Sequence, residues 1–355
     1  MTITADRAAK RERLLGVLAA AGADELVLTG HGAVSWYLGG ARTHVSLAGD
    51  PLLAVVVGRH RDTVVVFSNE RARLEAEELP ADIDVVEVPW HDPLASALPT
   101  GPRVLNEHDV AAELRAARAA LLPAELAGFR ALGRECAEVV TSVLGEARGI
   151  QSERDSAATL GAALISRGID PLVLLVAGRD RLAHRHPLPT DAPLGDRAMV
   201  VVCGRRDGLI ANLTRWVRFG PARAAEADAE ARIREVEAAF FAATVAGATL
   251  GDAFVAGTAG YAANGFDPDE WRNHHQGGAA GYNGRDPRAT PGATDIIQLG
   301  QAFAWNPTAP GAKIEDTVLL TADGIEVITA DDAWPTVTVG GIRRPVELQR
   351  PVELQ

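Results

Sequence analysis

Residues 208–215 read Gly-Leu-Ile-Ala-Asn-Leu-Thr-Arg, at the start of a run of mostly apolar residues that continues to Phe219. Short apolar runs bounded by glycine and charged residues favour buried strands. We expect such strands at 172–177, 198–203 and 209–219. Two segments rich in alanine follow, and they predict helices at about 222–246 and 249–264. This half of the chain is therefore predicted to be a mixed α/β unit.

The segment that follows these helices has a different character. Residues 272–311 are rich in glycine, asparagine and proline and show little periodicity. Segments of this kind commonly place binding and catalytic side chains on loops. Apolar runs at 313–320 and 326–329 then predict a hairpin across Ala322-Asp323-Gly324.

The N-terminal part of the chain predicts a smaller α/β unit. Helices are expected at 6–21 and 69–79, and strands at 25–29, 52–57, 63–67 and 84–88. Pro123 then opens a long helix, at a position where helices tolerate proline. We therefore place one domain at 1–122 and a second at 123–340. Residues 341–355 contain the sequence Arg-Pro-Val-Glu-Leu-Gln twice, and we set them aside as a tail.

Composition excludes several classes of protein. The formal net charge is −12, which disfavours nonspecific binding to nucleic acid. Cys136 and Cys203 are far apart, which argues against a disulfide framework and fits a reducing cytoplasm. No apolar run approaches the length of a membrane span, and the N-terminus lacks the pattern of a signal peptide. We expect a cytoplasmic protein with no nucleic-acid or membrane partner.

Four segments of the second half resemble, in order, motifs of the creatinase, aminopeptidase P and prolidase family, peptidase M24. They are His184-Arg-His-Pro, residues 208–215, His275-Gln-Gly-Gly, and Asn306-Pro307 with Lys313-Ile-Glu-Asp-Thr317. The last three look like the family's "GY-x-x-D-x-T-R", "HGIG", and "EPG" with "RIEDT". Trp36-Tyr-Leu-Gly-Gly40 resembles the smaller domain of the family. The resemblance implies a creatinase-like N-terminal domain, a pita-bread C-terminal domain, and a homodimer with its active site near the subunit interface.

The metallopeptidases that the chain resembles hold two metal ions with two Asp, one His and two Glu. Position by position, three of these carboxylates fall here on Val201, Asn212 and Asn306, while His275 and Glu315 are retained. The site has therefore lost three negative charges that would bind and bridge hard divalent cations. We expect no dinuclear metal centre and no cofactor.

Creatinase, which also lacks the metal ligands, hydrolyses a C–N bond with a histidine that corresponds here to His184. That resemblance predicts His184 as proton shuttle and His275 with Glu315 as an orienting pair, while His274 is expected to point elsewhere. A structural hydrogen bond is the alternative for the pair. Asn212 and Asn306 are expected to hold a polar substrate group or an oxyanion, or else simply to fill the former metal cavity.

Four further residues are assigned to substrate binding by the same resemblance. Tyr282 falls where relatives carry a substrate-facing histidine, and Arg285 resembles the arginine with which creatinase binds a carboxylate. Arg42 and His44 lie where one creatinase subunit reaches into the active site of its partner. Ordinary surface positions are the alternative for Arg285, Arg42 and His44.

These features predict a metal-independent hydrolase or lyase that cleaves a C–N bond in a small, polar, carboxylated molecule. Creatine itself fits poorly, because creatinase carries glutamates where this chain has Thr214 and Asn306. Three alternatives stay open: an Xaa-Pro-type metallopeptidase with an atypical ligand set, a catalytically inactive binding protein, and a biosynthetic enzyme of specialised metabolism. No GxSxG or HExxH motif points to another class of hydrolase.

Overall fold

The computed structural model describes residues 3–351 and divides the chain into two compact units. The first unit comprises the chain up to Ala124 together with Asp207–Leu209. The second comprises Glu125–Arg206 and the chain from Ile210 onward. None of the helices in the described range is both long enough and apolar enough to cross a membrane.

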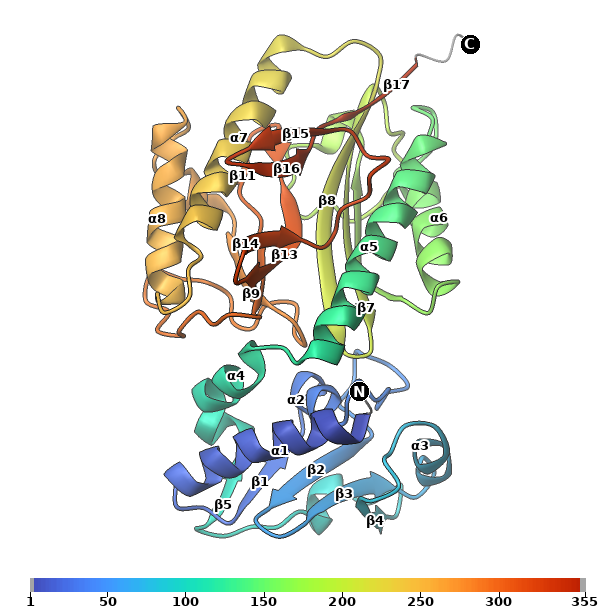
Figure 1. Ribbon diagram of the computed structural model, residues 1–355. Helices are drawn as coiled ribbons and strands as arrows, with labels where there is room; N and C mark the ends of the chain where they lie inside the picture. Colours follow the sequence, from blue (N-terminus) through green and yellow to red (C-terminus); the bar gives the residue numbers. More distant parts are fainter. Residues whose placement is uncertain (1–2, 352–355) are drawn as a thin grey trace. The chain divides into compact units, whose positions relative to one another are not determined.

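The first unit contains one mixed sheet with the strand order β4-β3-β2-β1-β5 (Figure 1). Its strands are β1 Glu25–Leu28, β2 Leu53–Gly58, β3 Asp62–Phe67, β4 Asp84–Val88 and β5 Val104–Asn106. Its helices are α1 Ile3–Ala20, α2 His31–Tyr37, α3 Arg71–Glu77 and α4 Ala111–Ala119. Valines of β2 and β3 form the buried centre of the sheet, as expected for β-branched side chains in paired strands.

The second unit is built on a larger sheet with the order β6-β7-β8-β13-β10-β9. These strands are β6 Asp170–Ala177, β7 Arg197–Arg206, β8 Leu209–Phe219, β9 Gly277–Ala280, β10 Ala302–Trp305 and β13 Glu315–Thr321. Two shorter strands complete it: β14 Gly324–Val327 pairs with β13, and β17 Leu348–Arg350 pairs with β8. Two separate two-stranded sheets are formed by β11 Thr308–Ala309 with β12 Ala312–Lys313, and by β15 Thr336–Val339 with β16 Ile342–Pro345. The predicted mixed α/β class is thereby confirmed.

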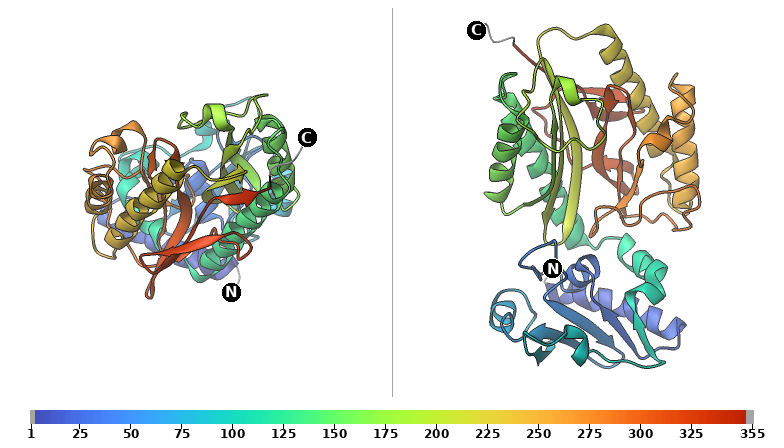
Figure 2. Two further views of the ribbon diagram at one scale, coloured as in Figure 1. Left: turned by 90° about the horizontal axis from the view of Figure 1, so that it is seen from above. Right: turned by 180° about the vertical axis from the view of Figure 1, so that it is seen from behind.

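Helices flank this sheet in two pairs, and Figures 1 and 2 show the pairs on opposite sides of the unit. The first pair, α5 Pro123–Gly145 and α6 Glu153–Ile165, lies beside β6 and β7. The second, α7 Ala224–Ala243 and α8 Leu250–Ala263, packs together and covers β9 and β10 through the aromatic cluster of Phe240, Phe254 and Trp305. The strands of the large sheet thus lie between the two helix pairs.

The pairing of β8 with β13 brings two of the motif segments together. Thr214 lies opposite Glu315 and Leu213 lies opposite Asp316 in this antiparallel pair. Because side chains alternate along a strand, Ile210, Asn212 and Thr214 share one face of β8, and Glu315 faces the same side. The register therefore places Asn212 and Glu315, two of the positions that the resemblance compares with metal ligands, on one surface.

The segment that we set aside as a tail belongs partly to the fold, and this interpretation needs correction. Residues 342–345 form β16, and 348–350 form β17, which pairs in parallel with β8. Arg344 is buried and forms ion pairs with Glu237 and Asp316, while Glu347 is paired with Arg197 and Arg218. Buried charges require such partners, so the first copy of the duplicated hexapeptide is held by them. The second copy lies largely outside the described residues.

Candidate active site

A cavity of about 460 Å³ opens on the inner face of β6, β7 and β8 in the second unit. It is lined by all five positions at which the resemblance places the metal ligands of the family. These are Val201, Asn212, His275, Asn306 and Glu315. Its volume lies in the range of small-molecule sites. Residues that are separated by more than a hundred positions in the chain therefore converge on one small-molecule-sized space.

Both carboxylate oxygens of Glu315, which lines this cavity, contact other side chains. Its Oε1 accepts a hydrogen bond from Arg285 Nη2 at 2.6 Å, and its Oε2 lies 3.7 Å from Lys313 Nζ. Thr214 Oγ1 also donates to Oε2, at 3.2 Å. Burial by itself raises the pKa of Glu315, but Lys313 and Arg285 more than offset this, so that the pKa is lowered. The carboxylate is therefore ionised, and both its oxygens already have cationic partners.

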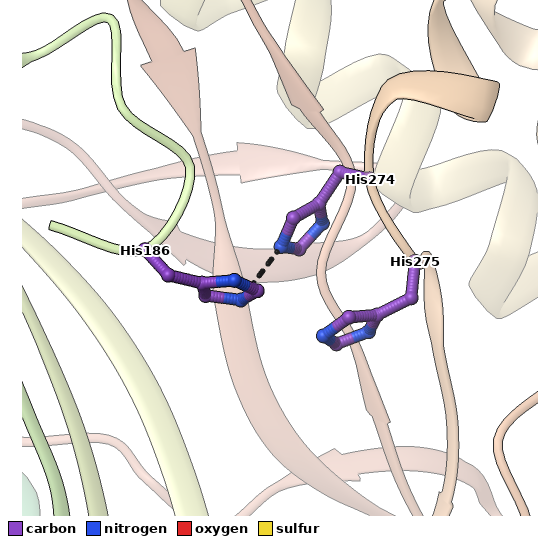
Figure 3. Close-up of side chains that lie close together, drawn as sticks. All are labelled: His186, His274 and His275. Carbon is purple, nitrogen blue, oxygen red and sulfur yellow. Dashed lines mark hydrogen bonds between the residues drawn. The ribbon is translucent and has the colours of Figure 1, made fainter.

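The predicted orienting pair of His275 and Glu315 is not joined by a hydrogen bond in the part of the chain that the structure describes. His275 instead belongs to a cluster of three histidines, whose imidazole rings converge in Figure 3. One ligand atom of each ring lies within 4.8 Å of those of the other two. The rings of His274 and His275 stack with centroids 4.3 Å apart, and those of His186 and His275 stack at 5.6 Å.

His274 and His186 form the closest contact of this cluster. Their Nε2 atoms lie 3.1 Å apart, so one ring donates the proton that the other accepts. The expectation that His274 points elsewhere is therefore wrong, because its buried ring meets His186. The pair permits His186 to bind a second proton while His274 stays neutral and accepts the hydrogen bond.

His184 is exposed and is not among the residues that line the cavity. The reason lies in the residue between the two histidines. Arg185 donates to Thr308 Oγ1 and to the carboxylate of Glu270, which anchors the loop. With Arg185 held in this way, His186, although exposed, lines the cavity, whereas the exposed His184 does not. The structure thus gives His186 the location that we predicted for His184.

All three imidazoles are held in the neutral form near pH 7. Burial, followed by the charges of Arg285 and Arg288, lowers the pKa of His275 to about 4. Burial and then Lys313 lower the pKa of His274 to about 2 and also lower the pKa of His186. Neutral imidazole can accept a proton or a hydrogen bond, and it is also the form that binds metal ions.

This electrostatic arrangement predicts a loss of stability in mild acid. Because the folded-state pKa of His274 and His275 lies below the value of 6.5 in the unfolded chain, the unfolded state binds more protons below that pH. Stability should be complete above pH 6.5 and decline toward pH 4. The slope is at most about 1.4 kcal/mol per pH unit for His274 and smaller for the more exposed His275.

Urea unfolding of the wild type and of His274→Asn at several pH values between 7 and 4 would measure this effect. The variant should show a flatter pH dependence, while the exposed control His184→Asn should follow the wild type. Parallel curves for all three proteins would contradict the assignment.

Two possible metal sites differ in how well they fit the residues present. Three neutral imidazoles are a suitable ligand set for one transition-metal ion such as Zn²⁺. The dinuclear centre fits poorly, because Val201 offers no ligand atom and both oxygens of Glu315 are paired. The cationic side chains of Lys313, Arg285 and Arg288 line the same cavity and oppose binding of any further cation.

Asn212 and Asn306 present oxygen atoms without partners. Asn212 Nδ2 donates to the carbonyl of Ile210 at 3.3 Å, and Asn306 Nδ2 lies 3.5 Å from Glu315 Oε1. The Oδ1 atom of each is buried and has no hydrogen-bond partner among the described residues. A flipped amide would place oxygen against oxygen, so this orientation is the favourable one. The unpartnered atoms are acceptors, which suit a donor group of a ligand, while the second N–H of each amide leaves the predicted role toward an oxyanion as a prediction.

Of the remaining predicted residues, only Arg285 is among those that line the cavity. Tyr282 is buried and donates to Glu125 on α5 at 2.6 Å, and it is not among the lining residues. Arg285 lines the cavity, as expected. Arg42 forms an ion pair with Glu78 on α3, and the ring of His44 contacts that of His31 at 6.0 Å. Their role in a neighbouring subunit stays a prediction.

Sequence reasoning missed several residues of the cavity. These are His186, Arg288, the cation of Lys313, and the apolar residues Leu172, Val173, Leu175 and Ile210, and the contact of His274 with His186 was missed as well. The motif that contains Lys313 does not by itself indicate that its ammonium group pairs with Glu315. The His-Arg-His sequence contained both candidate histidines, but nothing local distinguishes the one that faces inward. Arg288 stands in an irregular loop whose path the sequence does not specify.

Comparisons with known proteins support the fold. The model of metallopeptidase family M24 matches residues 127–322. The dipeptidase PepE of Mycobacterium ulcerans has a TM-score of 0.77 at 20% identity, over 98% of this chain and 99% of that one. The prolidase of Pyrococcus horikoshii OT3 has a TM-score of 0.74 at 16% identity, over 91% and 98%.

A third similar structure is the N-terminal domain of the FACT complex subunit SPT16 from chickpea. Its TM-score is 0.66 at 14% identity, over 92% of this chain and 97% of that one. No curated protein matches the chain in a sequence search. At these identities the structural likeness establishes the fold alone, and the predicted pita-bread architecture is confirmed.

Proposed function

The chain belongs to metallopeptidase family M24, and from that premise we propose that it is a hydrolase that cleaves a C–N bond without the family's pair of metal ions. Its substrate is a small carboxylated molecule that fits the cavity of about 460 Å³. One observation carries the proposal. Glu315, a retained ligand position, is bound through both oxygens by Arg285 and Lys313. A carboxylate that already pairs with two internal cations is a poor ligand for metal ions.

His186 takes the role of proton-transfer residue in this proposal. It accepts a proton from a water molecule as that water adds to the substrate carbon, and it then returns the proton to the departing nitrogen. Its contact with His274 fixes the position of one ring nitrogen through both steps. His275 contributes a neutral imidazole beside them. The cations of Arg285, Arg288 and Lys313 hold the substrate carboxylate. They also stabilise the negative charge that develops on the oxygen bonded to the attacked carbon.

Metal analysis is the most direct test of independence from the dinuclear centre. Protein produced in medium that contains manganese, cobalt and zinc is expected to carry none of them as a stoichiometric pair. Hydrolysis of C–N bonds in a panel of carboxylated amides should survive treatment with a chelator. Two ions per chain, or activity that chelation removes and manganese restores, would rule this proposal out in favour of an atypical metallopeptidase.

A second candidate, a hydrolase with a single metal ion, is favoured by the cluster of His186, His274 and His275. An ion held by three imidazoles would bind water at a fourth position and increase its acidity. One zinc ion per chain, lost in both His274→Ala and His186→Ala, would support this candidate. Zinc content that is independent of these two residues would exclude it.

The resemblance also implies a dimer, and it leaves an inactive binding protein as an alternative. We propose a homodimer in which Arg42 and His44 of one subunit approach the cavity of the other, which sedimentation and the variant Arg42→Ala would test. The alternative is a binding protein without catalytic activity. The wild type would then bind a carboxylated amide of the panel but hydrolyse none of them, and this result would contradict the proposed hydrolase.

A further inference from the structure

Two cavity-lining residues leave hydrogen-bond acceptors without donors. Asn212 and Asn306 are only 1% and 2% exposed, and each has an unpartnered Oδ1 atom. Leaving a buried polar atom unsatisfied is unfavourable, so water or a ligand is expected to supply a donor to each. Each amide nitrogen already donates one of its two N–H groups within the protein, so the atom left without any partner in each residue is the oxygen. A ligand that satisfies both must carry N–H or O–H donors.

The charged groups of the same cavity favour a ligand that carries an anionic hydrogen-bond acceptor. Arg285, Arg288 and Lys313 contribute three positive charges, against the single negative charge of Glu315. Arg285 Nε is a buried donor without an acceptor. For the Arg288 guanidinium, the described residues supply neither a hydrogen bond nor an ion pair. An anionic group, such as a carboxylate, would satisfy these donors and offset the excess charge.

A third part of the wall is apolar. Leu175, Val201 and Ile210 are buried and line the cavity together with the partly exposed Leu172 and Val173. Val201 stands at a position where the resemblance expects an aspartate, so apolar surface replaces charge there. A ligand with an aliphatic group would remove this surface from water.

From these three surfaces we infer that the cavity binds anionic molecules that combine an aliphatic side chain with a neutral N–H group, such as N-carbamoyl or N-acyl amino acids, and excludes molecules with a free amino group. The inference rests on the proposed function, because it names the substrate class of that hydrolase. The C–N bond to be cleaved is then an amide or ureido bond, in which the carbonyl carbon receives the water oxygen and the nitrogen receives a proton.

Charge decides between the neutral N–H group and an ammonium group. An ammonium group could also donate to Asn212 and Asn306, but it would lie near three cations and only one anion. Repulsion between like charges in a partly buried site is strong at separations of a few ångströms. A neutral amide supplies the same hydrogen bonds without this repulsion, and the carboxylate of the molecule is attracted to the arginines.

Calorimetric titration with a matched set of probes tests the inference. N-carbamoyl-L-leucine should bind at least about tenfold more tightly than L-leucine or L-leucylglycine, which carry ammonium groups. It should also exceed 4-methylpentanoate, which lacks the N–H donors, and (3-methylbutyl)urea, which lacks the carboxylate. N-carbamoylglycine should bind more weakly because it lacks the aliphatic group.

Variants at the amides separate recognition from a structural effect. Asn212→Leu and Asn306→Leu should each weaken N-carbamoyl-L-leucine about tenfold and leave binding of 4-methylpentanoate unchanged. The control Asn69→Leu, at an exposed site in the first unit, should change neither. Equal weakening of both probes, tighter binding of L-leucine or L-leucylglycine, or no binding of any probe would overturn the inference.

The outcomes for the inference and for the proposed function can be told apart. If N-carbamoyl-L-leucine binds as described but no amide or ureido compound is hydrolysed, the binding inference stands and the hydrolase does not. If the protein hydrolyses C–N bonds in substrates with free amino groups as efficiently as in carbamoylated ones, the hydrolase stands and the inference is overturned.

Discussion

His186→Asn is expected to lower kcat/KM for a hydrolysed amide or ureido substrate by about 10²–10⁴-fold, the usual contribution of a proton-transfer residue. His184→Asn should stay within about twofold of the wild type, because exposed substitutions away from a site rarely matter. The two residues are separated by a single position, which makes them a matched pair. Both side chains are exposed, but His186 lines the cavity and contacts His274, whereas His184 is not among the lining residues.

Steady-state kinetics of the two variants, with circular dichroism to verify folding, would measure this difference. His274→Asn should act through His186, so we expect a displaced pH profile and a smaller loss in kcat/KM than for His186→Asn. The reverse order, with His184→Asn inactive and His186→Asn active, would restore the assignment made from sequence.

Glu315→Gln is expected to destabilise the second unit by about 3–5 kcal/mol, the usual effect of breaking a buried ion pair from one side. The substitution leaves Lys313 and Arg285 without their anion, and the Lys313 and Glu315 side chains are only 4% and 2% exposed. The midpoint of urea unfolding near pH 7 should therefore fall markedly. An exposed ion pair provides the control, since Asp332→Asn should cost less than about 1 kcal/mol.

The double variant Lys313→Met/Glu315→Gln distinguishes this mechanism from a simple loss of packing. Removing the second charge of the pair should recover part of the lost stability, because no unpaired ammonium group then stays buried. If Glu315→Gln unfolds within 1 kcal/mol of the wild type, or if the double variant is less stable than the sum of the single ones, the cations do not depend on Glu315 as we describe.

Local patterns were sufficient to predict much of the second unit. The apolar runs that became β6, β7 and β8 were identified because buried strands need such residues along their length. The resemblance to the family also pointed to Val201, Asn212 and Asn306 as positions without the acidic side chains of metallopeptidases. All three line the cavity.

Side-chain positions in the segment 272–311 could not be predicted from local sequence patterns. Its backbone follows turns and short strands without a repeating period, so neither the contact of His274 with His186 nor the position of Arg288 was predictable. The tail was misjudged for a related reason. Its place beside β8 depends on ion pairs of Arg344 and Glu347 with residues more than a hundred positions away.

The amino-acid sequence by itself indicated the strands and helices of the mixed α/β fold, since these follow from residue type and regular spacing, and its motifs pointed to the family. Only the tertiary structure decided which histidine faces the cavity, which cations neutralise Glu315, and which amide oxygens lack a donor. Those choices depend on side-chain packing and charge between distant segments, and short-range periodicity carries no information about them.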